Sequence, residues 1–298
     1  MAPTTTPHMR LQKALTERQG GALPGEIPTK WEKFSDVVIL PQNAFCETEW
    51  EADESLWKIV AESLGVKRVA RMGEVQGEYR KSGVELLLGD DDWVVRREHG
   101  INFGYNFTQC MWSAGNVTER GRIANANHEG ERILDLYAGI GYYTLPFLSE
   151  GARGPNGERG QGHGAAHVVA CEWNEDAIRA LKWSLSANDL VNRCTILEGD
   201  NRNVDFQPEF DRVNLGLLPS SKDGYSLAIQ ALKSEGGILH VHGLAAGGKE
   251  EEWALDLASQ LEKLGNFTCS VVGIERVKWY APHQRHIVVD IHASPVSC

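Results

Sequence analysis

The stretch RILDLYAGIGYYTLPFL, residues 132 to 148, decides the fold of this 298-residue chain. Apolar residues at positions 133, 134 and 136 predict a buried strand, and Gly139 with Gly141 predicts a tight turn directly after it. The apolar run that follows predicts a helix over 142–151. Such a turn lets a ligand approach the backbone closely, and the helix N-terminus offers it free N–H groups. A nucleotide-type cofactor is therefore the first hypothesis.

Strand and helix patterns alternate from residue 132 to the end of the chain, which predicts an α/β fold with a mainly parallel sheet and helices on both faces. The last two strand patterns, 268–277 and 286–293, have no helix between them and predict an antiparallel hairpin. We divide the chain into a flexible leader (1–29), a small N-terminal α+β module on the substrate side (30–131) and a Rossmann-like catalytic domain (132–298). The Gly/Arg-rich segment 151–164 is predicted to be a flexible surface loop inserted in that domain.

The formal net charge of −11 argues against a nucleic-acid partner, but the charge is uneven along the chain. Residues 57–132 carry 11 basic and 11 acidic side chains, with basic clusters that could bind phosphate, so the nucleic-acid class stays open. The chain has no apolar run of eighteen residues, which argues against a membrane span, and no apolar signal core near its start. Its six scattered cysteines favour a reducing compartment, and we expect a cytoplasmic protein.

Polar side chains accompany the ends of four successive predicted strands, where an α/β sheet binds its ligands. Asp135 lies in the first strand just before the glycine turn, where a carboxylate needs hydrogen-bonding partners. Glu172 ends the second strand and could accept hydrogen bonds from both hydroxyls of a ribose. Asp200 and Asn201 follow the third strand and could bind the amino edge of adenine. The fourth strand ends with two residues expected on the substrate side, Asn214 and Pro219.

Each of these residues also has a simpler interpretation, in which the glycines serve packing, Asp200 ends a strand and Glu172 is solvated. Their occurrence in order at successive strand ends favours a ligand site instead. The turn lacks the third glycine of G-x-G-x-x-G and is preceded by Asp135, so S-adenosylmethionine fits better than NAD. His240 and His242 share one face of a predicted strand without a Cys or Glu ligand set, and we predict no metal site.

Several long segments together resemble the tRNA wybutosine-synthesizing protein 2 family, which is related to the tRNA guanine-37 N1-methyltransferases. The resemblance covers roughly residues 30–295. It rests on FTQCMWSAGNVTERGRIA (107–124), DLYAGIGYYTLPFL (135–148), ACEWNEDAIRALKWSLSAN (170–188), EGDNR (198–202), NLGLLPSS (214–221), GGILHVHG (236–243) and the YAPHQRHIVVDI ending. The resemblance implies a class I S-adenosylmethionine-dependent methyltransferase sheet used for a different transfer. That transfer moves the 3-amino-3-carboxypropyl group to 4-demethylwyosine at position 37 of tRNA(Phe) and releases 5′-methylthioadenosine.

The resemblance also implies roles for individual residues. The cofactor site would comprise Ser113, Arg120, Asp135, Gly139, Gly141, Glu172, Asp200 and Asn201. Arg120 could pair with the cofactor carboxylate, contact tRNA phosphate, or pair with Glu119 or another carboxylate, and the local motif favours the cofactor. We expect Arg122, Arg96 and Arg97 to contact phosphate. No catalytic base is assigned, although Asn214 or Asp135 could orient the substrate.

Three alternatives to this function remain. A guanine-37 N1-methyltransferase is disfavoured by Ala114-Gly115-Asn116, where those relatives often carry an arginine, and by NLGLLPSS in place of their NLP or NPP turn. A nicotinamide-dependent reductase is disfavoured by the missing third glycine. A binding protein without activity is disfavoured by the joint presence of Asp135, Glu172 and Asp200. We expect the anticodon region of tRNA(Phe) as partner and predict no obligate protein partner.

Overall fold

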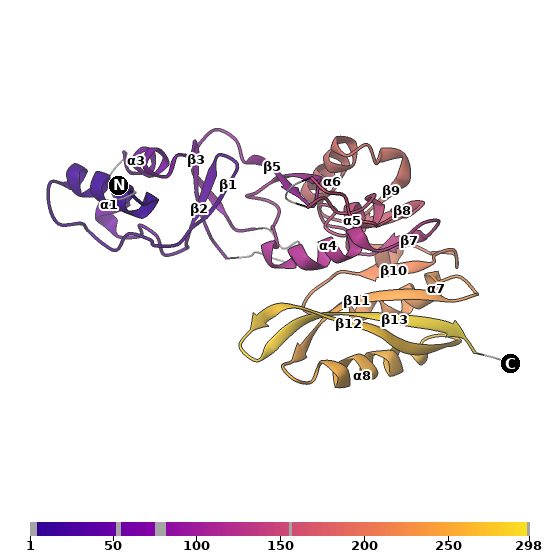
Figure 1. Cartoon of the computed structure of the whole chain (residues 1–298). Helices are drawn as coiled ribbons and strands as arrows, with labels where there is room; N and C mark the ends of the chain where they lie inside the picture. The colour runs from indigo at the N-terminus through magenta and orange to yellow at the C-terminus, as the bar shows by residue number, and fades with distance from the viewer. Residues whose placement is uncertain (1–4, 52–54, 75–81, 155–156, 297–298) are drawn as a thin grey trace. The chain divides into compact units, whose positions relative to one another are not determined.

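The computed structural model describes residues 5–51, 55–74, 82–154 and 157–296. The chain divides into two compact units, the first formed by residues 1–96 with 105–112 and the second by 97–104 with 113–298 (Figure 1). Strands β5 (Trp93–Glu98) and β6 (Ile101–Asn106) form a two-stranded sheet, and the division between the two units falls within each of these strands. The expected boundary at 131 therefore differs from the observed division. The reason is that helix α4 (Val117–Asn125) packs on the sheet of unit 2.

Unit 1 is an α+β unit with its own apolar core. Its four-stranded sheet has the order β1-β2-β3-β4, with β2 and β3 parallel and the outer pairs antiparallel. Helix α3 is capped at its C-terminus by Gly65, which has a φ of 64°. The elements are α1 (Pro7–Gln19), β1 (Glu32–Phe34), β2 (Val37–Leu40), α2 (Thr48–Glu51), α3 (Leu56–Leu64), β3 (Arg68–Arg71) and β4 (Glu85–Leu88).

The segment expected to be a flexible leader contains helix α1. The Thr6 hydroxyl accepts a hydrogen bond from the Met9 N–H (3.2 Å), which caps the first turn of this helix. Leu11 and Leu15 lie four residues apart on one helical face, and both are buried in the core of unit 1. Arg10 also donates to the Ser63 carbonyl of α3 (3.1 Å), so residues 7–19 are part of the folded unit.

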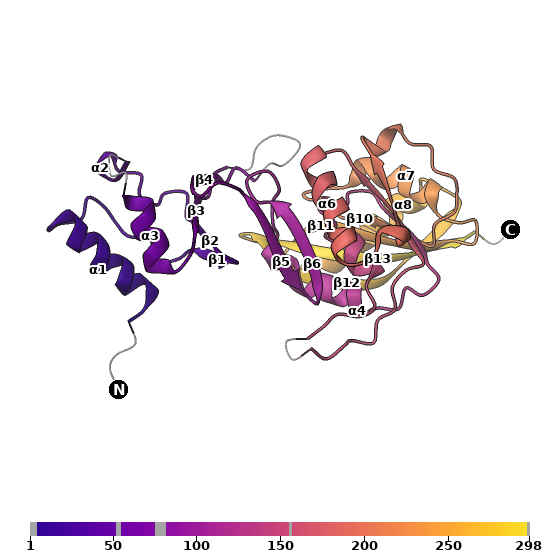
Figure 2. The same ribbon diagram turned by 90° about the horizontal axis from the view of Figure 1, so that it is seen from above.

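Unit 2 contains a seven-stranded sheet in the order β12-β13-β11-β10-β7-β8-β9. The five strands from β11 to β9 are parallel, and β13 runs antiparallel between β11 and β12. The predicted α/β fold and terminal hairpin are confirmed (Figures 1 and 2). The elements are α4, β7 (Arg132–Asp135), α5 (Thr144–Leu148), β8 (His167–Glu172), α6 (Glu175–Ala187), β9 (Cys194–Glu198), β10 (Arg212–Leu215), α7 (Tyr225–Ala231), β11 (Gly237–Ala246), α8 (Glu250–Glu262), β12 (Phe267–Ala281) and β13 (Gln284–Pro295), with short 3-10 turns at 114–116, 191–193, 201–203 and 222–224.

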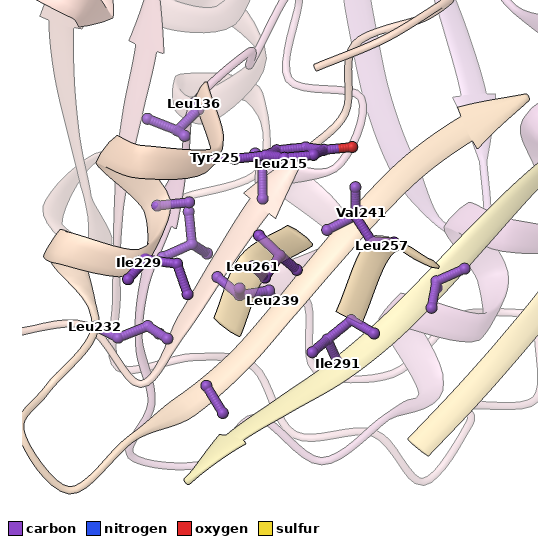
Figure 3. Packing of buried hydrophobic residues seen from close by; sticks show 14 of the residues in the cluster. Leu136, Leu215, Tyr225, Ile229, Leu232, Leu239, Val241, Leu257, Leu261 and Ile291 are labelled. Atoms are coloured by element: carbon purple, nitrogen blue, oxygen red, sulfur yellow. The ribbon is translucent and has the colours of Figure 1, made fainter. Parts of the chain in front are cut away.

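The two-residue period of the strands separates an apolar face from a polar one. Leu134, Val213, Leu239 and Ile291 are in register across β7, β10, β11 and β13, and all four are buried in one cluster. Helices α7 and α8 cover this face with Tyr225, Ile229, Leu257 and Leu261 (Figure 3). The neighbouring residue of each strand, which is the following one in β7, β10 and β11 and the preceding one in the antiparallel β13, points to the opposite face. These residues form a row of polar side chains, namely Asp135, Asn214, His240 and Asp290.

Two local expectations in unit 2 differ from the structure. The helix expected over 142–151 is only the five residues of α5, because Gly141 with a φ of 96° belongs to the turn and Gly151 with a φ of 88° follows the helix. The described residues of the 151–164 insertion are hydrogen-bonded, since Gly160 donates to the Ala152 carbonyl (2.7 Å) and the Asn125 side chain accepts from Ala152 (3.0 Å). In the described residues, no helix has the length and apolar character to cross a membrane.

Candidate active site

The glycine turn after β7 has a backbone conformation that depends on its two glycines. Gly139 has a φ of 56° and Gly141 a φ of 96°, values that glycine adopts without steric cost. A Cβ on Gly141 would lie 2.8 Å from Leu181 Cδ1 and 3.0 Å from Leu145 Cγ, so this position also requires glycine for packing. The turn is fixed to β8 because the Ala138 N–H donates to the Cys171 carbonyl (3.0 Å).

Glu172 joins the second strand end to this turn. Its Oε2 accepts from the Gly139 N–H (2.7 Å), and its Oε1 accepts from the Trp173 and Asn174 N–H groups (3.0 and 2.8 Å). Burial raises the pKa of the Glu172 carboxyl, although these N–H donors oppose the shift. Three hydrogen bonds leave Oε2 with a further acceptor position. A ribose hydroxyl could bind there directly, whereas binding both hydroxyls requires Glu172 to give up a backbone partner.

The two residues predicted at the end of the third strand, Asp200 and Asn201, have different surroundings. Asn201 is nearly buried, and its Nδ2 donates to the Leu136 carbonyl (2.6 Å), so it lies against the end of β7. Asp200 caps the following turn and forms an ion pair with Arg202 (2.6 Å), which holds the pKa of Asp200 below its usual value. The structure therefore brings Asn201 toward the glycine turn, while the Asp200 carboxylate is occupied by Arg202.

Asp135 and Asn214 form the centre of the polar row. The Asp135 carboxylate is fully buried and accepts from the Thr144 hydroxyl (2.7 Å) and from Asn214 Nδ2 (2.8 Å). Burial raises the pKa of Asp135, and these hydrogen bonds oppose the rise. Because the Asn214 amide turns its N–H₂ toward the carboxylate, its Oδ1 is left buried without a hydrogen-bonding partner. Asp135 thus orients Asn214, and Asn214 keeps an unused acceptor. Pro219, beyond a cis peptide bond after Leu218, is exposed.

Two of the predicted arginines, Arg120 and Arg122, are already paired with carboxylates. Arg120 is buried and donates through Nε and Nη2 to both oxygens of Glu98 and through Nη1 to the Ser113 carbonyl (3.1 Å). Of the interpretations left open for Arg120, a pair with another carboxylate is the one observed. A cofactor carboxylate would have to compete with Glu98. Arg122 binds Glu119 (2.8 Å) and Asp290 (3.1 Å), so it is not an unpaired phosphate contact.

The two other arginines expected to contact phosphate belong to different units. In unit 1, Arg96 pairs with Glu32 (2.6 Å), donates to the Tyr105 hydroxyl (2.7 Å) and lies over the Phe34 ring at 3.5 Å from its centroid. In unit 2, Arg97 is exposed. Arg97 is therefore better placed than Arg96 to meet a ligand phosphate.

Sequence reasoning missed two sets of residues on the polar face. Asn116 Nδ2 donates to the Tyr143 hydroxyl (3.1 Å), which ties the segment after Ser113 to the glycine turn. Lys278 of β12 donates to the Ser113 hydroxyl (3.0 Å). No local sequence signal identifies Lys278, because 165 residues separate the two partners.

The second missed set is a buried charged network around His240. Its Nδ1 lies 2.6 Å from Asp290 and its Nε2 lies 3.1 Å from Glu119, while Arg122 bridges the same two carboxylates. Burial alone would lower the pKa of His240, but the two carboxylates raise it above its ordinary value. His242 lies on the same face as His240, and its Nδ1 is 3.0 Å from His286 Nε2. In the described part of the chain, no group of these residue types is arranged to hold a metal ion.

The strand order of unit 2, with Glu172 bonded to a glycine turn at the end of the first parallel strand, defines a Rossmann-like protein of the methyltransferase type. Two family models match the chain, described as "TRM5/TYW2 methyltransferase domain" over residues 94–256 and "TYW2 N-terminal domain" over residues 11–92. The chain belongs to the tRNA wybutosine-synthesizing protein 2 family.

Individual relatives agree with this assignment. A tRNA wybutosine-synthesizing protein 2 homolog of Danio rerio is 37% identical over 309 residues, covering 91% of this chain and 73% of the relative. The tRNA wybutosine-synthesizing protein 2/3/4 of Arabidopsis thaliana is 42% identical over 94% of this chain. This chain spans only 27% of the Arabidopsis protein and 25% of its Oryza sativa counterpart.

Two solved structures share the fold over most of the chain. The P. horikoshii TYW2 in complex with MeSAdo has a TM-score of 0.75 and 26% identity, covering 95% of this chain and 99% of that one. The M. jannaschii TYW2 in complex with AdoMet has a TM-score of 0.66 and 25% identity, covering 90% of this chain and 100% of that one.

Proposed function

We propose that this protein transfers the 3-amino-3-carboxypropyl group of S-adenosylmethionine to 4-demethylwyosine at position 37 of tRNA(Phe). The other product is 5′-methylthioadenosine. The observation that carries the proposal is the junction of Glu172 with Gly139, in a chain of the wybutosine-synthesizing protein 2 family. Relatives solved with AdoMet and with MeSAdo support S-adenosylmethionine as the co-substrate.

The residues of unit 2 fit an adenosine placed across the strand ends. Glu172 would accept from the ribose through the acceptor position left on Oε2. Asn201, held against β7, would lie beside the adenine, with Asp200 able to contribute only if it turns from Arg202. The unpartnered Oδ1 of Asn214 would accept a donor from the cofactor tail or the tRNA base. Asp135 acts through Asn214, so its role is positioning.

The transfer is a displacement at the γ-carbon of the methionine tail. The acceptor atom of the base forms a bond to that carbon while the carbon–sulfur bond breaks, the sulfur keeps the electron pair, and the base releases a proton. A sulfonium has three carbons open to attack, so the pose of the cofactor decides which group leaves. Positioning and exclusion of water around the cationic sulfur would supply most of the rate enhancement.

We propose that the tip of the β12–β13 hairpin faces the tRNA base. Trp279 and Tyr280 are 57% and 44% exposed, and they follow Lys278, which contacts Ser113. Exposed aromatic rings stack on unpaired bases, as in an anticodon loop. Arg285 lies over the Trp279 ring (4.2 Å to its centroid) and adds positive charge at the same tip.

We propose that the protein acts in the cytoplasm and that it binds the anticodon region of the tRNA. No disulfide joins the five cysteines at described positions, which agrees with a reducing compartment (46, 110, 171, 194 and 269). The position of the modified base in the tRNA is part of the proposed reaction and is tested with it.

The test uses S-adenosylmethionine labelled separately in its methyl group and in its carboxypropyl carbons. The protein is incubated with tRNA(Phe) carrying 4-demethylwyosine, and label in the tRNA and the nucleoside product are both measured. We expect carboxypropyl label in the tRNA and an equal amount of 5′-methylthioadenosine.

A parallel incubation uses tRNA(Phe) with unmodified guanine at position 37. Methyl label in that tRNA, with S-adenosylhomocysteine as product, would establish guanine-37 methylation instead. Absence of both labels together with tight NADH binding would overturn both transferase functions. The Asn214→Ala variant serves as a site control, because it should lower transfer without changing which label is transferred.

A further inference from the structure

Lys278 lies at the edge of the sheet where the parallel strands end. In the register of the sheet, Lys278 of β12 lies opposite His286 of β13, and His286 lies opposite Leu244 near the carboxyl end of β11. The Lys278 ammonium donates to the Ser113 hydroxyl at 3.0 Å. The terminal hairpin therefore brings a cation from the far end of the sequence to the side of the sheet that carries the glycine turn.

The segment beneath Lys278 is tied directly to that turn. A Cβ on Gly115 would lie 2.5 Å from Lys278 Cδ and 3.0 Å from its Nζ, so the end of the lysine side chain lies directly against this segment. One residue further, Asn116 donates to the hydroxyl of Tyr143, which follows the glycine turn. Contacts thus run without a break from the turn through Tyr143, Asn116 and Ser113 to the ammonium.

Lys278 differs in its charge balance from three paired arginines of unit 2. Arg120 is paired with Glu98, Arg122 with Glu119 and Asp290, and Arg212 with Glu131, all within unit 2. Among the residues that the structure describes, Lys278 forms no ion pair with a carboxylate, and its hydrogen-bond partner is the neutral Ser113 hydroxyl. Burial lowers the pKa of Lys278, and the positive charge of Arg120 lowers it further. A partly desolvated ammonium of this kind is stabilised by an anion.

We propose that Lys278, with the Ser113 hydroxyl, anchors the carboxylate of the amino-acid tail of S-adenosylmethionine. The inference rests on the proposed function and replaces Arg120, whose guanidinium already holds both oxygens of Glu98. An anchored carboxylate restricts rotation of the tail, so the direction of its γ-carbon–sulfur bond is set before the base attacks.

The test compares three ligands on the full-length protein by calorimetric titration. S-adenosylmethionine has the tail carboxylate, decarboxylated S-adenosylmethionine keeps the sulfonium without it, and 5′-methylthioadenosine lacks the whole tail. Lys278→Met should weaken S-adenosylmethionine binding by about 10- to 100-fold, the range expected for a lost charged hydrogen bond. Binding of the other two ligands should stay within about twofold, and Lys278→Arg should restore most of the lost affinity. Lys249→Met, which removes an exposed lysine paired with Glu252, is the matched control and should bind all three ligands as the parent does.

Three outcomes would overturn the assignment. Equal affinity of the parent and Lys278→Met for S-adenosylmethionine would exclude the anchor. Equal weakening of all three ligands would indicate that Lys278 only supports the local fold. A loss of tRNA affinity with a shallower salt dependence, at unchanged cofactor affinity, would assign Lys278 to a phosphate. These titrations measure cofactor binding and not group transfer. A failure of the Lys278 proposal can therefore be distinguished from a failure of the proposed function, which the labelling experiment tests. A parent protein that does not bind S-adenosylmethionine would overturn both proposals.

Discussion

Replacing His240 by glutamine should destabilise unit 2 more at pH 6 than at pH 9.5. The buried network contains two carboxylates, Glu119 and Asp290, and two cations, Arg122 and His240. The glutamine leaves one cation for two carboxylates, and removing one partner of a buried pair costs about 3–5 kcal/mol. Because Arg122 still contacts both carboxylates, we expect the lower end, about 3 kcal/mol, when the imidazole of the parent is charged.

The pH dependence follows from the raised pKa of His240. The imidazolium contributes its full stabilisation below the unfolded-state pKa near 6.5, and the contribution is lost as the pH rises through the higher folded-state pKa. The neighbouring His286, with its pKa lowered by burial to about 4, stays neutral over this range. The difference between parent and variant should therefore shrink to about 1–2 kcal/mol at pH 9.5, where a neutral hydrogen bond and packing remain.

The assay is urea unfolding of the parent and of His240→Gln at both pH values. The transition of unit 2 is assigned by pulsed proteolysis within β11 (residues 237–246). His292→Gln, which changes an exposed histidine of β13, should alter the free energy of unfolding by less than about 0.5 kcal/mol at either pH. A cost below about 1 kcal/mol at pH 6 would show that His240 is neutral in the folded protein, and a cost that is the same at both pH values would refute the predicted loss of its charge between them.

Three further predictions concern the site. Asp135→Asn should cost about 1–3 kcal/mol in urea unfolding, because one of its two buried donors would face an amide N–H₂, and Thr144→Val should cost less. An unchanged unfolding midpoint for Asp135→Asn would contradict this arrangement. Glu172→Ala should weaken S-adenosylmethionine binding by roughly 1.5–3 kcal/mol in calorimetry, and retained affinity would refute its ribose role. Glu98→Gln should lower stability by about 3 kcal/mol by removing the carboxylate that accepts two hydrogen bonds from the buried Arg120, whereas a minor effect would contradict the importance of this pair.

The alternation of apolar and polar side chains along the strands can be predicted from the sequence alone. Leu134 beside Asp135 and Leu239 beside His240 follow the two-residue period that a strand imposes, and both pairs divide between the apolar and polar faces as that period requires. The glycine turn was readable for the same local reason, since positive φ values at Gly139 and Gly141 depend on the residues themselves.

Contacts between residues of distant segments cannot be predicted from the local sequence. The sequence does not identify Glu98 as the partner of Arg120, and it predicts a flexible segment before residue 30, where the structure buries Leu11 and Leu15. In both cases the local pattern is compatible with a solvated surface. The deciding contact comes from another element, whose position the chain acquires only on folding.

The sequence by itself determined the α/β class, the glycine turn and the acidic residues at successive strand ends, because backbone geometry ties these features to neighbouring positions. Only the tertiary structure decided which charges meet. The insertion of β13 between β11 and β12 places Asp290 beside His240, and the same hairpin carries Lys278 to Ser113. Charge pairing depends on distances of a few ångströms between side chains, and strand order rather than sequence separation sets those distances.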